Sequence, residues 1–162
     1  MGAGDNGALI IGMGNGFRRD DGAGLEVVRQ LANHDMAGFR LMTLSGDGTE
    51  LLELWKHQEK VIIVDAVCSG AAPGTVHQIQ ADHLNGLKNL TTISTHGFGL
   101  MEAVNLAAAM GQLPPGLIIY GIEGKSFEHG PGLSPEVDRA VEQVVEHIVE
   151  GVRCTSTASP GI

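Results

Sequence analysis

A glycine-rich stretch that carries two adjacent acids most constrains what this chain can fold into. Residues 12–24 read GMGNGFRRDDGAG, and the two acids are Asp20 and Asp21. The apolar run 8–11 precedes the stretch, and apolar residues at helical spacing follow it: Leu25, Val28, Leu31 and Ala32. This order predicts a strand, a tight turn and a helix, because glycines let the backbone bend and pass close to other groups. In an open α/β sheet such turns lie where ligands usually bind, so we expect both acids at that edge.

Strand and helix patterns alternate along the rest of the chain. The β-branched run KVIIVD at residues 60–65 indicates a central strand that is buried on both faces. From Ser134 and Pro135 onward, apolar residues keep helical spacing for about five turns. We expect further strands at 39–44, 75–80 (at an edge of the sheet) and 117–122, helices at 48–57 and 98–110, and a loop at 85–92. The alternation predicts a three-layer α/β/α sandwich, with a mainly parallel sheet of about five strands and helices on both faces.

Size and charge limit the classes of protein to which the chain can belong. Its 162 residues suit one domain, which we expect at 1–154, followed by a flexible tail at 155–162. A net charge of -9 with only ten Lys and Arg disfavours nucleic-acid binding, which needs clustered basic residues. The start of the sequence lacks the pattern of a signal peptide, and no apolar run approaches the roughly 18 residues of a membrane span. With two cysteines, too few for a disulfide framework, the chain is expected to be cytoplasmic, without a membrane or nucleic-acid partner.

Three polar residues stand at equivalent places in the expected fold. Asp21 follows the first strand, Asp65 ends the strand at 60–65, and His96 comes just before a helix. Because such ends can converge on one crevice, the two carboxylates and the imidazole would form a mixed oxygen and nitrogen site for zinc, nickel, iron or manganese. A purely structural interpretation stays open beside this one: a helix cap for Asp21, loop hydrogen bonds for Asp65, and a hydrogen-bonded polar role for His96.

Other kinds of site receive less support from the sequence. Phe17 stands where a dinucleotide-binding fingerprint has glycine or alanine, and the two acids would repel a pyrophosphate. The signatures of a phosphate loop and of a nucleophile elbow are absent. Cys68 lies near Asp65 in sequence, and its pairing with His96 as nucleophile and base stays open against the simpler interpretation of a loop cysteine without a role. His129, in a loop near the end of the last strand, is a further candidate for ligand contact.

Five motifs, in order, resemble those of the hydrogenase maturation proteases, the endopeptidases that trim the C-terminal extension from the large subunit of nickel-iron hydrogenases. The motifs are GMGN with DDGAG at 12–24, VDA at 64–66, STHGFGL at 94–100, YGIEG at 120–124 and LSPEV at 133–137. The resemblance runs from Leu9 to Val149. It implies a twisted five-stranded sheet with helices on both faces, in which one strand can run antiparallel.

The resemblance also implies an activity and a set of site residues. Asp21, Asp65 and His96 match the family's metal-contacting positions, the first of which is a glutamate in some members. The implied partner is a nickel-loaded hydrogenase large-subunit precursor, so the nickel is expected to come with the substrate rather than to be held tightly by the enzyme. These three residues are then expected to dock on that nickel and to position the peptide bond for attack by water, with Asp20 or Asp65 as general base.

Two other functions remain as alternatives. One is a non-catalytic, nickel-binding or chaperone-like protein that inspects the hydrogenase subunit, and the other is an amidohydrolase that acts on small amides with a metal of its own.

Overall fold

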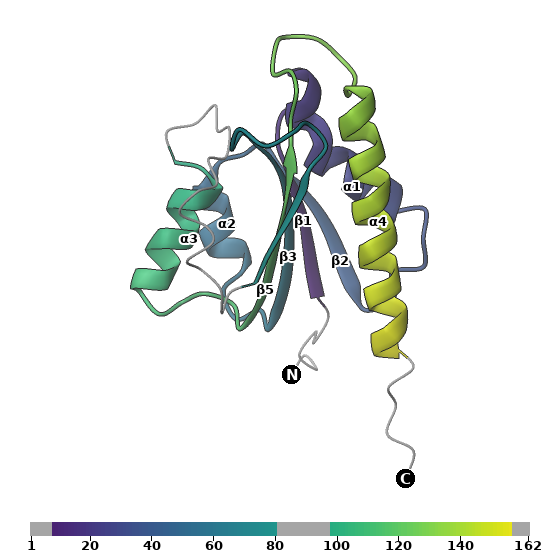
Figure 1. Ribbon diagram of the computed structural model, residues 1–162. Helices are drawn as coiled ribbons and strands as arrows, with labels where there is room; N and C mark the ends of the chain where they lie inside the picture. The colour runs from purple at the N-terminus through teal and green to yellow at the C-terminus, as the bar shows by residue number, and fades with distance from the viewer. Residues whose placement is uncertain (1–7, 81–97, 157–162) are drawn as a thin grey trace.

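A five-stranded sheet in the order β2-β1-β3-β5-β4 forms the middle layer of the molecule (Figure 1). The structure is a computed structural model and describes residues 8–80 and 98–156. β1, β2, β3 and β5 are parallel, whereas β4 pairs antiparallel with β5 at one edge, so both the mainly parallel sheet and the edge position are confirmed. The strands are β1 (Ala8–Met13), β2 (Phe39–Leu44), β3 (Lys60–Val67), β4 (Val76–Gln80) and β5 (Gly116–Glu123).

Helices cover both faces of this sheet, which confirms the expected three layers. α1 and α4 pack on one face, and α2 and α3 pack on the other (Figure 1). In the part of the chain that the structure describes, none of the helices combines the length and the apolar character needed to span a bilayer. The helical segments are η1 (Arg19–Gly22, a 3-10 turn), α1 (Ala23–Leu31), α2 (Gly48–Leu54), α3 (Leu100–Ala109) and α4 (Pro135–Ser156).

The central strand β3 illustrates how the sequence produces these layers. Successive side chains of a strand point to opposite faces, and in β3 both sets are apolar. Ile62 and Val64 join the core under α1 and α4, while Val61 and Ile63 join the core under α2 and α3. A strand buried on both faces needs this continuous apolar run, so the prediction for residues 60–65 is confirmed.

Several element ends differ from the expected ones. α2 stops at Leu54 because Trp55 caps it and His57 adopts a positive φ of 63°, which cannot continue a helix. In α1, Ala23, Val27, Val28 and Leu31 are buried, whereas Ala32, expected on the apolar face, is exposed. The last helix continues to Ser156, two residues into the expected tail at 155–162. The remainder of that tail and the loop expected at 85–92 lie outside the described residues.

Candidate functional site

Asp21 and Asp65 lie at the point where the direction of the strand order reverses. From β1 the chain passes through α1 to β2 on one side, and α2 then leads back across β1 to β3 on the other side. The connections that leave the carboxyl ends of β1 and β3 therefore run toward opposite edges of the sheet, and such a switch point is where open α/β folds bind ligands. Asp21 lies in η1, directly after β1, and Asp65 lies near the end of β3. The structure thus places two of the three predicted site residues at this crevice.

Glycines allow the turn that carries Asp21 to pack tightly against β1 and β3. A Cβ atom on Gly24 would lie only 2.3 Å from the carbonyl oxygen of Val64 and 2.6 Å from that of Met13. On the facing strand, a Cβ atom on Gly12 would lie 2.2 Å from the Gly24 carbonyl oxygen. Only glycine fits at such approaches, so these two residues bring the start of α1, and η1 before it, against the strand that carries Asp65.

The two carboxylates are buried and poorly compensated. Asp21, 2% exposed, accepts one hydrogen bond through Oδ2 from the Asn15 amide (3.2 Å), while its Oδ1 has no partner among the described residues. Asp65, 5% exposed, accepts a hydrogen bond only from the adjacent Ala66 amide (2.9 Å) within the part described. Burial raises the pKa of Asp21 despite the opposing charge of Arg18. Burial and the negative charge of Asp21 together raise the pKa of Asp65 well above its ordinary value. Two acids held in this way form a site suited to a cation or to a proton.

The third predicted ligand, His96, falls outside the described residues, so the structure neither joins it to the two acids nor separates it from them. Within residues 8–80 and 98–156, no three His, Cys, Asp or Glu side chains come together as a metal-binding group. His129 is exposed on the loop that follows β5. Cys68, which comes directly after β3, is a free and exposed cysteine. Its pairing with His96 remains a prediction.

Asp20 has a structural role that the sequence did not indicate. Its fully buried carboxylate accepts hydrogen bonds from the amides of Lys125 (2.8 Å), Ser126 (2.9 Å) and Ser134 (2.7 Å), and from the Ser134 hydroxyl (2.7 Å). Burial raises its pKa, but these hydrogen bonds outweigh burial, and the net effect lowers the pKa. Asp20 therefore fastens the loop after β5 to the turn after β1. A carboxylate engaged by four donors is poorly placed to serve as the general base, a role that the sequence left to Asp20 or Asp65.

A fourth buried acid, Glu123 at the end of β5, was not among the predicted site residues. Glu123 is 2% exposed, and its carboxylate accepts hydrogen bonds from the Ser69 amide (2.8 Å), the Ser69 hydroxyl (2.8 Å) and the Gly70 amide (3.2 Å). His77 Nε2, on β4, lies 3.2 Å from Glu123 Oε2. Burial raises the pKa of Glu123, but the hydrogen bonds from Ser69, His77 and Gly70 outweigh it, so the net effect is a lowered pKa. The cluster anchors the loop after β3, and with it the segment that follows Asp65.

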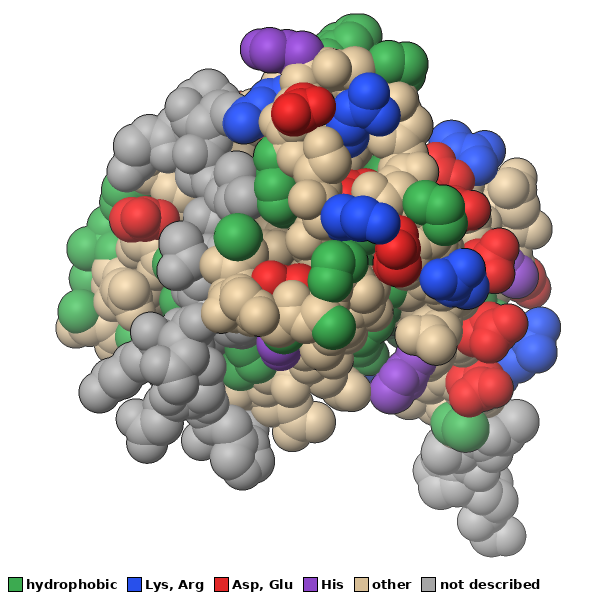
Figure 2. All heavy atoms as spheres, turned by 45° about the horizontal axis from the view of Figure 1, so that its top comes forward, with side chains coloured by type: hydrophobic (Ala, Val, Ile, Leu, Met, Phe, Trp, Pro, Cys, Tyr) green, Lys and Arg blue, Asp and Glu red, His purple; other side chains and the backbone are tan. Residues whose placement is uncertain are grey.

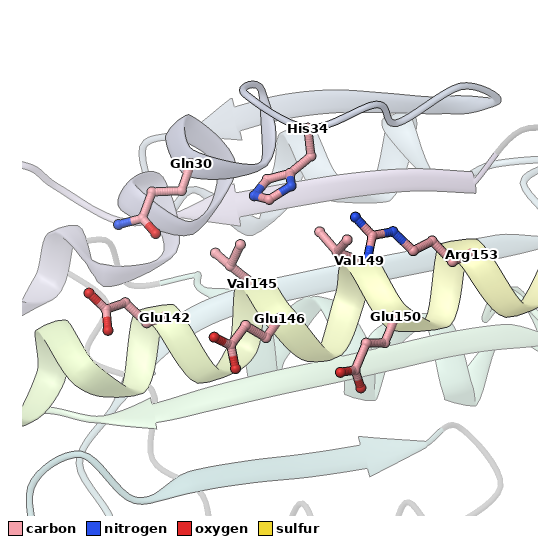
Figure 3. Close-up of a pocket in the computed structure, with 8 residues that line it drawn as sticks. All are labelled: Gln30, His34, Glu142, Val145, Glu146, Val149, Glu150 and Arg153. Atoms are coloured by element: carbon pink, nitrogen blue, oxygen red, sulfur yellow. The ribbon is translucent and has the colours of Figure 1, made fainter.

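A hollow elsewhere on the molecule has a different character. It encloses about 320 Å³ between α1 and α4. Figure 3 shows Val145, Val149 and Arg153 pointing from α4 toward α1, with His34 on the opposite side. The hollow lies along the later turns of α4, whereas the switch point lies at the carboxyl ends of the strands (Figure 1). It is therefore separate from the acids that form the candidate site.

The fold and sequence are similar to those of known hydrogenase maturation proteases. The profile of the family HycI, hydrogenase maturation protease, matches residues 25–151. The hydrogenase 2 maturation protease of Escherichia coli is 28% identical over 90% of this chain and 90% of its own length. The hydrogenase expression/formation protein HupD of Thiocapsa roseopersicina is 26% identical over 88% of this chain, which spans 66% of that protein.

Two solved structures give the same result. The hydrogenase maturating endopeptidase HybD from E. coli superposes with a TM-score of 0.72 at 27% identity, covering 92% of this chain and 93% of its own. The [NiFe] hydrogenase maturation protease HybD from Thermococcus kodakarensis superposes with a TM-score of 0.70 at 28% identity, covering 90% of this chain and 99% of its own.

Proposed function

This chain belongs to the hydrogenase maturation protease family, and from that premise we propose that it removes the C-terminal extension of a nickel-iron hydrogenase large subunit. The relatives and structural neighbours are endopeptidases, so the reaction is hydrolysis of a peptide bond. The observation that carries the proposal is the pair of buried carboxylates, Asp21 and Asp65, at the switch point of the sheet. Its substrate is a precursor that already holds nickel.

The metal that this site contacts belongs to the substrate. Asp21 Oδ1 is buried without a partner among the described residues, so a cation brought by the precursor would satisfy it. The negative charge of Asp21 next to Asp65 also favours a cation between the two elements. Two carboxylates and one imidazole are too few for a dedicated structural site, which fits a metal that arrives with its own protein ligands. His96 comes shortly before Leu100, the first residue of α3, and we assign it as the nitrogen donor.

The catalytic role that remains is activation of water. A metal carried by the substrate would supply Lewis-acid chemistry at this place, polarising the scissile carbonyl or lowering the pKa of the attacking water. Asp65 is the candidate general base, because Asp20 is engaged by four hydrogen-bond donors and Asp21 lies in the turn that meets the substrate. Burial of Asp65 excludes competing solvent from its carboxylate and holds a proton there once it is taken up.

The reaction is assigned to the cytoplasm and to a protein substrate alone. Cys68 is a free, exposed thiol, which suits a reducing compartment. The net charge of -9 argues against nucleic acid as a partner.

The decisive test is a mass assay of the purified precursor, with and without nickel, after incubation with the wild type or Asp21→Asn. Wild type should release a short C-terminal peptide only from nickel-loaded precursor, and Asp21→Asn should release none. Asp138→Asn is the matched control, because Asp138 is exposed on α4 and its loss of charge should leave processing intact. Binding of the precursor without shortening by wild type would overturn the protease assignment in favour of a chaperone-like assembly protein.

A further inference from the structure

A groove of about 210 Å³ adjoins the turn that carries Asp21. It is formed by that turn, the first residues of α1 and the loop before α4. Leu25 and Leu133 are the apolar side chains that line it, and Arg19, Arg29 and Glu26 are the charged ones. The other lining residues are glycines, which have no side chain to fill the space: Gly16, Gly22 and Gly132. Figure 2 turns the carboxyl edge of the sheet toward the viewer, and basic and acidic side chains alternate over the loops there. The groove adjoins the acid site in sequence, since Gly22 follows Asp21 directly.

Arg19 is held in this groove by its backbone in a conformation that costs free energy. Its φ is 46°, in the left-handed region that an arginine rarely adopts. Two backbone hydrogen bonds join the turn after β1 to the loop after β5. The Arg19 amide donates to the Gly130 carbonyl (3.0 Å), and the Gly130 amide donates to the Phe17 carbonyl (2.8 Å). Strained residues that the surrounding structure maintains in this way cluster at functional sites.

The guanidinium of Arg19 lies beside Gly130, and no carboxylate of the described residues neutralises its charge. A Cβ atom on Gly130 would lie 3.5 Å from both Nε and Nη2 of Arg19, so the guanidinium lies against the bare backbone of Gly130. Arg19 is exposed, and its side chain has no hydrogen bond or ion pair with any residue that the structure describes. Arg29, which also lines the groove, differs, because its Nε donates to Glu26 Oε2 (2.7 Å) in an ion pair. The groove therefore presents one cation with its donors available, beside an acid that is already compensated.

We infer that this groove binds a carboxylate of the precursor's C-terminal segment through Arg19. A guanidinium offers two parallel donors that match a carboxylate, and Leu25 and Leu133 suit an apolar side chain next to it. The inference rests on the proposed function, since the occupant is the substrate peptide that continues from the acid site. The carboxylate belongs either to an Asp or Glu side chain of that segment or to its terminal carboxyl group. Arg19 is thus a substrate-binding residue on the far side of the turn from the metal-reading acids.

The test compares Arg19→Asn, Arg19→Lys and wild type in the processing of nickel-loaded precursor over a range of concentrations. Asparagine tolerates a positive φ better than arginine does, so Arg19→Asn removes the charge without harming the fold, and its melting temperature should not fall. We expect the half-saturating precursor concentration to rise about tenfold in Arg19→Asn, with a maximal rate within about twofold of wild type. Arg19→Lys should recover part of the difference. Arg40→Gln, which removes an exposed arginine on β2, is the control and should match wild type.

A second arm identifies the carboxylate. Synthetic peptides of the extension compete with the precursor in three forms: unchanged, amidated at the C-terminus, and with Asp and Glu replaced by Asn and Gln. One of the two altered peptides should compete about tenfold less well against wild type, and both should compete equally with the unchanged peptide against Arg19→Asn. Equal half-saturating concentrations for wild type and Arg19→Asn, in a preparation where wild type cleaves, would overturn the inference and leave the protease assignment intact. Failure of wild type to cleave would overturn both.

Discussion

Gly24 lies so close to Val64 that no side chain can stand between them: a Cβ atom on Gly24 would come within 2.3 Å of the Val64 carbonyl oxygen. Val64 precedes Asp65, and Gly24 comes three residues after Asp21, as the sequence shows. This one backbone contact therefore sets the separation of the two elements that carry the acids.

Gly24→Ala should consequently damage both the fold and the site. The new methyl group meets backbone atoms of β3 and β1, which cannot move aside as the end of a side chain can. We expect the free energy of unfolding to fall by about 2 kcal/mol or more in urea titrations. Gly151→Ala is the control, because Gly151 lies in α4 with nothing within 4 Å of its added Cβ atom, and this change should stabilise by about 0.5–1 kcal/mol. Equal stability of Gly24→Ala and wild type would show that the helix can withdraw from the strand at no cost.

Asp65→Asn should reduce processing of the precursor without lowering the stability of the fold. The amide keeps the shape of the carboxylate but removes a buried charge that Asp21 opposes. Processing of nickel-loaded precursor should fall about 100-fold, whereas the melting temperature of the isolated protein should stay the same or rise. A drop in melting temperature that parallels the loss of processing would instead assign Asp65 a structural role.

Asp20→Asn should have the opposite profile, with the main loss in stability. An asparagine amide cannot accept the hydrogen bonds that the second carboxylate oxygen accepts, so buried donors of the loop at 125–134 lose their partner. We expect the free energy of unfolding to fall by about 3 kcal/mol. Asp35→Asn is the matched change at an exposed position, where the only hydrogen bond that the aspartate accepts from the described residues comes from the Ala37 amide (3.2 Å). It should cost about 0.5 kcal/mol or less.

The Glu123 cluster should make stability depend on pH in the acid range. Because hydrogen bonds hold the pKa of Glu123 below its ordinary value of 4.5, its carboxylate stabilises the fold above that pH. This contribution is lost as the pH falls through the lower pKa of the folded state. Glu123→Gln should therefore be less stable than wild type by about 2 kcal/mol at pH 7, and the difference should shrink steadily below pH 4.5 in urea titrations. Glu128→Gln, at an exposed position, should show no difference at either pH. A gap for Glu123→Gln that is the same at neutral and acid pH would mean that packing, not charge, is the cause.

Those parts of the fold that depend on local pattern could be predicted from the sequence. β3 and α4 have long, uninterrupted apolar patterns, and both were found close to their expected bounds. The position of Asp65 followed from a strand that ends on an acid, and that of Asp21 followed from a turn after a strand. The same signal was present at Glu123, which ends the apolar strand β5, and it was overlooked.

Roles that depend on distant donors could not be predicted. The donors to Asp20 come from residues 105 to 114 positions away, and nothing in the turn itself indicates which of the two adjacent acids they reach. Likewise, Ser69 and His77 lie 54 and 46 positions from Glu123. Ser69 meets Glu123 because β3, which ends at Val67, pairs with β5, and His77 meets it because β4 runs antiparallel beside β5.

The 3-10 turn η1 directs its two adjacent acids to different places. Asp20 points to the loop after β5, whereas Asp21 points to the crevice beside Asp65. Loops of this kind usually tolerate insertions and deletions. Here a change of one residue between β1 and η1 would rotate each carboxylate by about 120°, the angle between successive residues of a 3-10 helix. One of the two acids would then take the direction of the other, and the second acid would face neither the loop nor the crevice. The length of this turn is therefore as restricted as the identity of its residues.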